Sequence, residues 1–203
     1  MCGYGYGGVG PGRRGSCFAL YRRFPFAKAL GTDSLEGMPR KTAEDVISEL
    51  SLRPHPEGGW FKRTYTSGIE VESSNGLRPC STSILYLLKR GEVSSLHYLD
   101  ADETWYFHEG ATLALHQFDR GNYQSVNIGN TQFSGALQQW TIRAGIIFGA
   151  VPDPAPPYDW SLVSCSVAPG YLAEGFFWPD CTEMRETYKK AQPILDLLDP
   201  GGR

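Results

Sequence analysis

The distribution of short β-rich runs between turn signals limits the fold of this chain more than any other feature. Pairs such as Arg90-Gly91 and Gly129-Asn130 separate runs that are too short for helices. Many short strands without intervening helices predict an antiparallel sandwich or barrel, an all-β fold. The predicted strands are Gly59–Thr66, Ser81–Leu88, Val93–Leu99, Glu103–His108, Thr112–Phe118, Tyr123–Ile128, Leu137–Ile142, Gly145–Ala150 and Trp160–Ala168.

Helices are expected only at the two ends of this β region. Thr42 followed by Asp45 is a capping-box pattern that predicts a helix start, and the prolines after Leu52 forbid its continuation. A last helix is expected to begin near Asp180 or Thr182 and to be broken or restarted at Pro193. The proline-rich segment Val151–Asp159 predicts a surface loop.

Residues 1–37 differ in composition from the rest of the chain. The first part is rich in glycine and the second in arginine, without an acidic residue up to Thr32, which predicts a disordered extension. Its composition also resembles an organellar presequence. One alternative is that these residues are a solvated extension without function. Another is that Met1 is an upstream start codon that is not used, so that the domain opens at Met38. The predicted domain therefore spans residues 38–203.

Charge and cysteine content exclude several classes of protein. The 203-residue chain has a net charge of -3, which does not suggest nucleic-acid binding. It contains no apolar run of the roughly 20 residues that span a membrane. Its five cysteines are scattered and odd in number, without a C-x-x-C pair. These features predict reduced thiols in an intracellular, cytoplasmic protein, or an organellar one if residues 1–37 are a presequence.

A spaced motif runs from Gly91 to Gly110. Its pattern, G-x5-H-x-H-x3-E-x6-G, is the first motif of the cupin superfamily, and every spacing fits. The first histidine is His97 and the glutamate is Glu103, but Leu99 replaces the second histidine. In the second cupin motif, Phe148 stands where a metal-binding histidine is expected.

Further segments narrow the resemblance to one family. The stretches Leu52-RPHPEGGWF, Thr82-SILYLL and Leu162-VSCSVAPGY, together with the first motif, resemble the small-cupin family Cupin_5, or DUF985. The resemblance implies a double-stranded β-helix, or jelly roll, with short terminal helices. It also implies a homodimer and a pocket inside the barrel. It implies no reaction, and fold alone does not supply one.

His97 and Glu103 are the candidate catalytic residues. Strand alternation places His97 on one face with Val93, Ser95 and Leu99. A neutral imidazole beside a carboxylate in an apolar cavity suits a general base or a ligand contact. The alternative is a buried pair whose two side chains only satisfy each other's hydrogen bonding and have no functional role. Transition metals usually take three or four protein ligands, so no metal or other cofactor is expected. His108 or His116 could replace the missing metal ligands, unless their side chains face outward.

The remaining candidate residues are expected to bind a ligand. The loop before Trp60 presents an imidazole and a carboxylate on a backbone shaped by prolines and glycines, and Arg63 follows it as an anchor for an anionic group. The alternative is a structural turn with surface charges. Three aromatic side chains are expected to line the pocket. These candidates are His55, Glu57, Arg63, Tyr86, Trp105 and Phe148.

Three functions are consistent with these features. The first is binding of a small polar metabolite, as in a metal-independent isomerase or epimerase that shares this barrel. The second is a metal-dependent oxygenase or isomerase with a reduced ligand set. The third is a non-catalytic binding or storage-type cupin. Neither nucleic acid nor membrane is expected as a partner.

Overall fold

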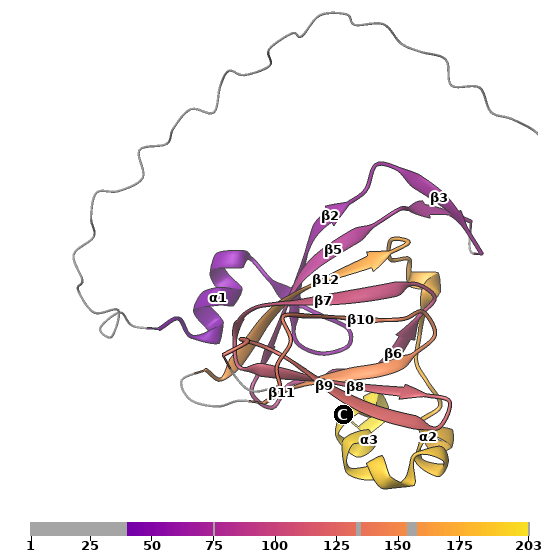
Figure 1. Cartoon of the computed structure of the whole chain (residues 1–203). Helices are drawn as coiled ribbons and strands as arrows, with labels where there is room; N and C mark the ends of the chain where they lie inside the picture. The colour runs from indigo at the N-terminus through magenta and orange to yellow at the C-terminus, as the bar shows by residue number, and fades with distance from the viewer. Residues whose placement is uncertain (1–39, 75, 133–134, 154–157, 203) are drawn as a thin grey trace, which may run out of the picture. The chain divides into compact units, whose positions relative to one another are not determined.

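The computed structural model describes residues 40–74, 76–132, 135–153 and 158–202. The predicted extension, residues 1–37, and the predicted start of the domain at Met38 lie outside these residues. Arg40–Arg203 is one compact unit, consisting mostly of antiparallel strands with short helices at either end (Figure 1). The predicted all-β fold with terminal helices is confirmed.

Two sheets pack face to face to form the barrel. The six-stranded sheet has the order β1 (Arg53–Pro54), β2 (Trp60–Thr66), β5 (Thr82–Lys89), β12 (Trp160–Ala168), β7 (Asp102–Gly110), β10 (Gln139–Ile142). The five-stranded sheet has the order β13 (Phe176–Phe177), β6 (Ser94–Leu99), β11 (Ile147–Asp153), β8 (Thr112–Asp119), β9 (Asn122–Ile128). Side chains from both inner faces form one core that is rich in aromatic residues.

The helices cover the outer faces of the sheets. Helix α1 (Ala43–Leu50) begins at Thr42, whose hydroxyl and backbone form the predicted capping box with Asp45. Its apolar face packs on the six-stranded sheet. Helices α2 (Cys181–Thr187) and α3 (Gln192–Leu198) cover the five-stranded sheet (Figure 1). The predicted restart at Pro193 is confirmed, since this proline lies in the first turn of α3. Three 3₁₀ turns are η2 (Ala173–Gly175), η3 (Lys189–Ala191) and η4 (Pro200–Gly202).

The predicted surface loop Val151–Asp159 is wrong in its first part. Strand β11 continues to Asp153, and Pro152 pairs with Leu113 of β8. A proline fits here because pairing with β6 on the other side of β11 ends at Ala150, so no ladder hydrogen bond is needed there. Residues 154–157 of the predicted loop lie outside the described residues.

His97 faces the cavity as predicted, but a bulge in β6 changes which residues share its face. Phe148 pairs with His97 and Ala150 with Ser94, so β6 carries an extra residue between these two pairs. Ser94 therefore points inward with His97. Val93 packs instead under the C-terminal helices, on the outer face. Leu99 is on the inner side, as predicted.

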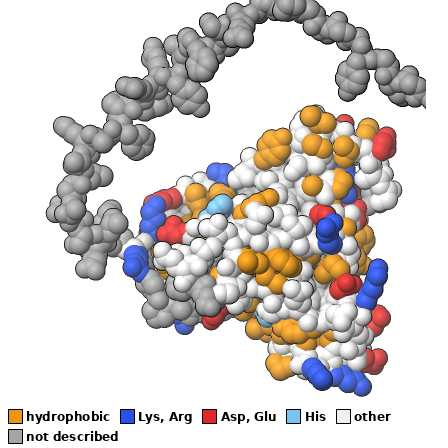
Figure 2. Space-filling view, in the orientation of Figure 1, with side chains coloured by type: hydrophobic (Ala, Val, Ile, Leu, Met, Phe, Trp, Pro, Cys, Tyr) orange, Lys and Arg blue, Asp and Glu red, His pale blue; other side chains and the backbone are white. Residues whose placement is uncertain are grey.

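A hairpin that the sequence analysis does not predict extends from the barrel. Its strands are β3 (Glu70–Ser73) and β4 (Gly76–Pro79), which pair only with each other (Figure 1). Apolar side chains are exposed on and beside it (Figure 2). They are Tyr65 (53% exposed), Ile69 (70%) and Leu77 (60%).

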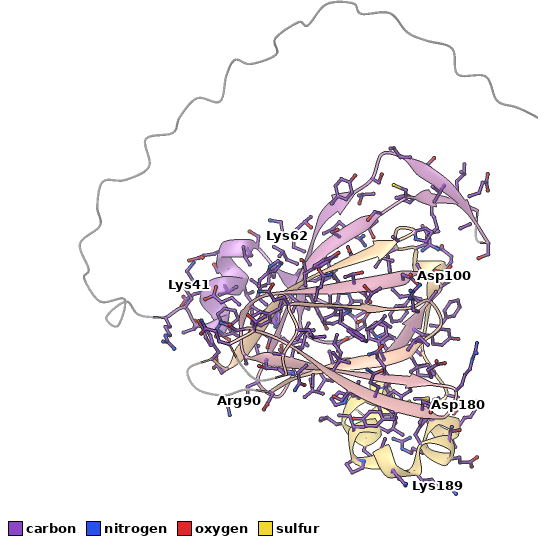
Figure 3. The ribbon with its side chains drawn as sticks, in the orientation of Figure 1. Lys41, Lys62, Arg90, Asp100, Asp180 and Lys189 are labelled. Carbon is purple, nitrogen blue, oxygen red and sulfur yellow. The ribbon has the colours of Figure 1, made fainter. Side chains whose placement is uncertain are left out.

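A buried ion pair ties this hairpin to the barrel. The Arg78 guanidinium is 2% exposed and donates to both carboxylate oxygens of Asp100 at 3.0 Å and to the carbonyl oxygen of Gly170 at 2.6 Å. Asp100 lies at the end of β6, on the side of the hairpin (Figure 3). Its backbone N–H donates to the carbonyl oxygen of Gly175. The pair therefore joins the hairpin, β6 and the segment before β13.

The helices of the described residues are too short to cross a membrane. None of them is long and apolar enough to form a membrane span.

Candidate functional site

A cavity of 460 Å³ lies between the two sheets and opens to solvent. Seven of the eight predicted site residues line it, namely His55, Glu57, Arg63, Tyr86, His97, Glu103 and Trp105. The eighth, Phe148, is not among the lining residues. Its ring packs on the imidazole of His97, with the ring centroids 4.1 Å apart.

His97 is fixed in one neutral tautomer by its own strand. The imidazole is 1% exposed, and Nδ1 lies 2.7 Å from the carbonyl oxygen of Ser95. A carbonyl oxygen only accepts, so Nδ1 carries the hydrogen. In the neutral ring, the lone pair is then on Nε2. Burial lowers the pKa of His97, which favours this neutral form.

The loop between β1 and β2 brings Glu57 to His97. Gly59 has a φ of +70°, and a Cβ there would lie 2.6 Å from the carbonyl oxygen of Leu87, so only glycine fits. The carbonyl oxygen of Glu57 accepts from the backbone N–H of Ser95 and, at 2.8 Å, from its hydroxyl. The backbone N–H of Glu57 donates to Nδ1 of His55 at 3.2 Å. The loop is therefore attached to β6, and Glu57 is buried rather than a surface charge.

Glu57 and His97 form a contact that requires a proton. Oε2 of Glu57 lies 3.5 Å from Nε2 of His97 and accepts from the Ser94 hydroxyl at 3.0 Å. A carboxylate facing the Nε2 lone pair would repel it, so a proton must lie on one of the two groups or on a molecule between them. Burial raises the pKa of Glu57 and lowers that of His97. Both shifts favour a proton on Glu57 over one on His97.

Glu103 is a second buried acid, and one of its two oxygens has no partner among the described residues. Its side chain is 7% exposed, and Oε2 makes no hydrogen bond with the described residues. Burial raises the pKa of Glu103 to about 7, against the opposing effect of His97. Nε1 of the neighbouring Trp105 is also buried without an acceptor. Near neutral pH, Glu103 can therefore donate or accept a proton, and it has an oxygen free to do so.

Aromatic rings enclose these polar groups. The Tyr86 hydroxyl donates to the carbonyl oxygen of Gly58 at 2.7 Å, which supports the loop that carries Glu57. The Tyr86 and Trp105 rings meet edge to face with centroids 5.7 Å apart. Phe176 stacks on His97 with centroids 5.2 Å apart. The groups that titrate therefore lie in a mostly apolar cavity, which explains the displaced pKa values.

The donor set does not fit the metal site of the wider superfamily. Leu99 lines the cavity and Phe148 covers His97, so hydrocarbon occupies two of the four ligand positions. Among the described residues, no three His, Cys, Asp or Glu side chains are grouped to hold an ion. His108 is exposed and bonds Ser164, and His116 stacks on Tyr123, so neither replaces a ligand.

Other lining residues are absent from the sequence-based prediction. Arg53 lies at the mouth beside Arg63, and Tyr171, Phe176 and Trp178 come from the segment after β12. Their signals in the sequence are weak, because none of them belongs to a long alternating run. Cys165 also lines the cavity. Burial raises the pKa of its thiol, so it is protonated rather than a nucleophile.

The fold and the cavity inside the barrel define a cupin. Residues 44–178 match the family Cupin_5, cupin superfamily (DUF985), and the chain belongs to this family. A hypothetical protein from Leishmania major is 32% identical, with a TM-score of 0.71 over 78% of this chain and 99% of that one. Protein SO0799 from Shewanella oneidensis is 30% identical, with a TM-score of 0.71 over 79% and 98%.

A more distant relative is the uncharacterized protein YML079W of Saccharomyces cerevisiae. It is 24% identical over 151 residues, which cover 66% of this chain and 73% of the yeast protein. The names of these relatives state no activity. The comparisons therefore establish the family and the fold, and the chemistry must be argued from the cavity.

Proposed function

We propose that the cavity binds a small polar metabolite and that His97 and Glu103 move a proton on it without a metal, as in an isomerase or epimerase. The observation that carries this proposal is the pairing of two opposite groups in one cavity. His97 is a neutral imidazole with its lone pair on Nε2, and Glu103 presents a carboxyl group with an unpaired oxygen and a pKa of about 7. A neutral base together with an acid that titrates near neutral pH is what proton transfer at carbon requires.

The step can be written for a substrate with a C–H bond beside a carbonyl group. The substrate displaces the carboxyl group of Glu57 from Nε2 of His97. Nε2 then takes the proton, and the electron pair of the C–H bond moves to form C=C while the carbonyl oxygen takes a proton from Glu103. In the reverse direction, the enol returns its proton to Glu103 and carbon takes one from His97. Return of the proton to the neighbouring carbon of a hydroxycarbonyl compound, while the hydroxyl group of the first carbon gives its proton to Glu103, produces the isomer. The carbonyl oxygen of Ser95 and the rings of Phe148 and Phe176 hold the orientation of His97.

Solvent exchange tests the proposal before the substrate is known. The protein is incubated in D₂O with a panel of hydroxycarbonyl metabolites, and mass spectrometry measures deuterium bound to carbon. We expect incorporation for at least one compound, with a rate that falls at least about a hundredfold in His97→Gln and in Glu103→Gln. The exposed Glu109→Gln on the same strand is the control. Binding without exchange would favour the non-catalytic binding protein, and exchange lost on treatment with a chelator would favour the metal-dependent enzyme.

We also propose that the protein is an intracellular homodimer. The three cysteines of the described residues, Cys80, Cys165 and Cys181, are free thiols, in keeping with a reducing compartment. The exposed apolar side chains on the β3–β4 hairpin favour burial against a second copy. The mass in solution tests the dimer.

A further inference from the structure

Two arginines stand side by side at the mouth of the cavity. Arg53 on β1 and Arg63 on β2 both line it, and both are exposed at their outer ends. The Arg53 guanidinium lies 4.9 Å from the centroid of the Phe61 ring, and that of Arg63 lies 5.5 Å from the Tyr171 ring. Contact with a ring face holds a guanidinium in place and leaves its N–H groups free for an oxyanion.

These two arginines have no acidic partner among the described residues, a property that they share with Arg40 and Arg90 outside the cavity. Neither guanidinium has a carboxylate within 4.0 Å among the described residues. Four arginines outside the cavity do have one, and these are Arg78, Arg120, Arg143 and Arg185. Burial lowers the pKa of Arg63, and the like charge of Arg53 lowers it further. Two like charges without a counter-charge are costly unless a ligand supplies one.

The interior of the cavity does not compensate these charges. Burial raises the pKa values of Glu57 and Glu103 and lowers those of His55 and His97, so all four groups shift toward their neutral forms. A guanidinium keeps its charge at any physiological pH. The cavity therefore has a positive mouth over an interior whose titratable groups are shifted toward their neutral forms, which attracts an anion and orients it with its charge toward the mouth.

We propose that the ligand carries a carboxylate or phosphate group, which Arg53 and Arg63 bind at the mouth, and that its uncharged polar end reaches His97 and Glu103. This inference rests on the proposed function, since it assigns the substrate class of the same cavity. The class is a small anionic hydroxycarbonyl compound, a size that suits 460 Å³. Arg53, which the sequence analysis does not select, becomes a residue that determines specificity.

Calorimetry with matched probes tests the anion site separately from the chemistry. The full-length protein is titrated with benzoate, phenyl phosphate and the neutral benzamide, whose rings suit a mouth lined by Phe61, Tyr171 and Trp178. We expect at least one anion to bind about tenfold or more tightly than benzamide, and added salt to reduce this preference. The tighter anion identifies the oxyanion, carboxylate or phosphate, that the mouth prefers.

Substitutions then locate the preference. Arg53→Met and Arg63→Met, singly and together, are expected to remove it while benzamide binding changes less than about threefold. Lys62→Met is the matched control, because Lys62 lies between Phe61 and Arg63 but points outward to the carbonyl oxygen of Leu50 (Figure 3). The thermal midpoint of each variant shows whether it is folded. If the double variant does not fold, the binding data of the two single variants test the preference.

The outcomes separate this inference from the proposed function. Equal binding of benzamide and both anions, no binding of either anion, or a preference that persists without the two arginines would overturn the anion site. Deuterium exchange would then still support the proton chemistry. A preference that depends on the arginines, without exchange on any metabolite, would keep the anion site and remove the chemistry.

Discussion

Glu103→Gln is expected to change how the stability of the fold depends on pH. Burial raises the pKa of Glu103, one oxygen of which has no partner among the described residues, from its ordinary value of 4.5 to about 7. The folded protein therefore holds this proton more tightly than the unfolded chain. The resulting stabilisation is complete below pH 4.5 and is lost as the pH rises to about 7. Each pH unit in this window contributes about 1.4 kcal/mol, which gives about 3 kcal/mol in total.

Glutamine has nearly the same shape and does not titrate, so the variant lacks this dependence. Urea unfolding, followed by tryptophan fluorescence at a series of pH values from 4.5 to about 8, gives the free energy of unfolding of both proteins. The wild type is expected to lose about 3 kcal/mol relative to the variant across the series. Glu109→Gln, on the same strand but exposed, is the control. A difference that stays constant within about 1 kcal/mol would refute the burial argument.

Three further predictions concern the loop, the terminus and the assembly. Tyr86→Phe removes the hydrogen bond to the carbonyl oxygen of Gly58. The free energy of unfolding, measured in urea, is expected to fall by about 1 kcal/mol. An unchanged urea midpoint would mean that the loop does not depend on this bond. Deleting residues 1–37 should leave the thermal midpoint unchanged, since α1 has its own cap at Thr42; a fall of several degrees would contradict this. Light scattering should give twice the mass of the chain, and the monomer mass at all concentrations would exclude the dimer.

The all-β fold is predictable because its strands alternate and its turns are marked by glycine and asparagine. The β3–β4 hairpin is not, because its strands are short and mostly polar and pair only with each other. The continuation of β11 through Pro152 is hidden for another reason. A proline predicts a loop unless the neighbouring strand is known to end beside it.

The candidate site is predictable only where a motif marks it. His97 and Glu103 stand at motif positions, but the contact of Glu57 with His97 joins segments far apart in the sequence. The bulge in β6 shows a second limit. Spacing alone assigns Val93 and Ser95 to the face of His97, and only the pairing with β11 shows that Ser94 is the inward residue. Arg53 escapes notice because it lies in a two-residue strand that ends at Pro54.

The ion pair of Arg78 and Asp100 has a consequence for reading natural variants of this gene. A Cβ at Gly175 would overlap the carboxylate of Asp100, whose backbone N–H donates to the carbonyl oxygen of Gly175. Gly175→Ala is a chemically conservative replacement. It would nevertheless push the carboxylate of Asp100 away from the guanidinium of Arg78, which is 2% exposed. Separating a buried pair typically costs about 3–5 kcal/mol, a large part of the stability of a small domain. A conservative substitution of Gly175, which lies outside the cavity, is therefore expected to destabilise the fold strongly.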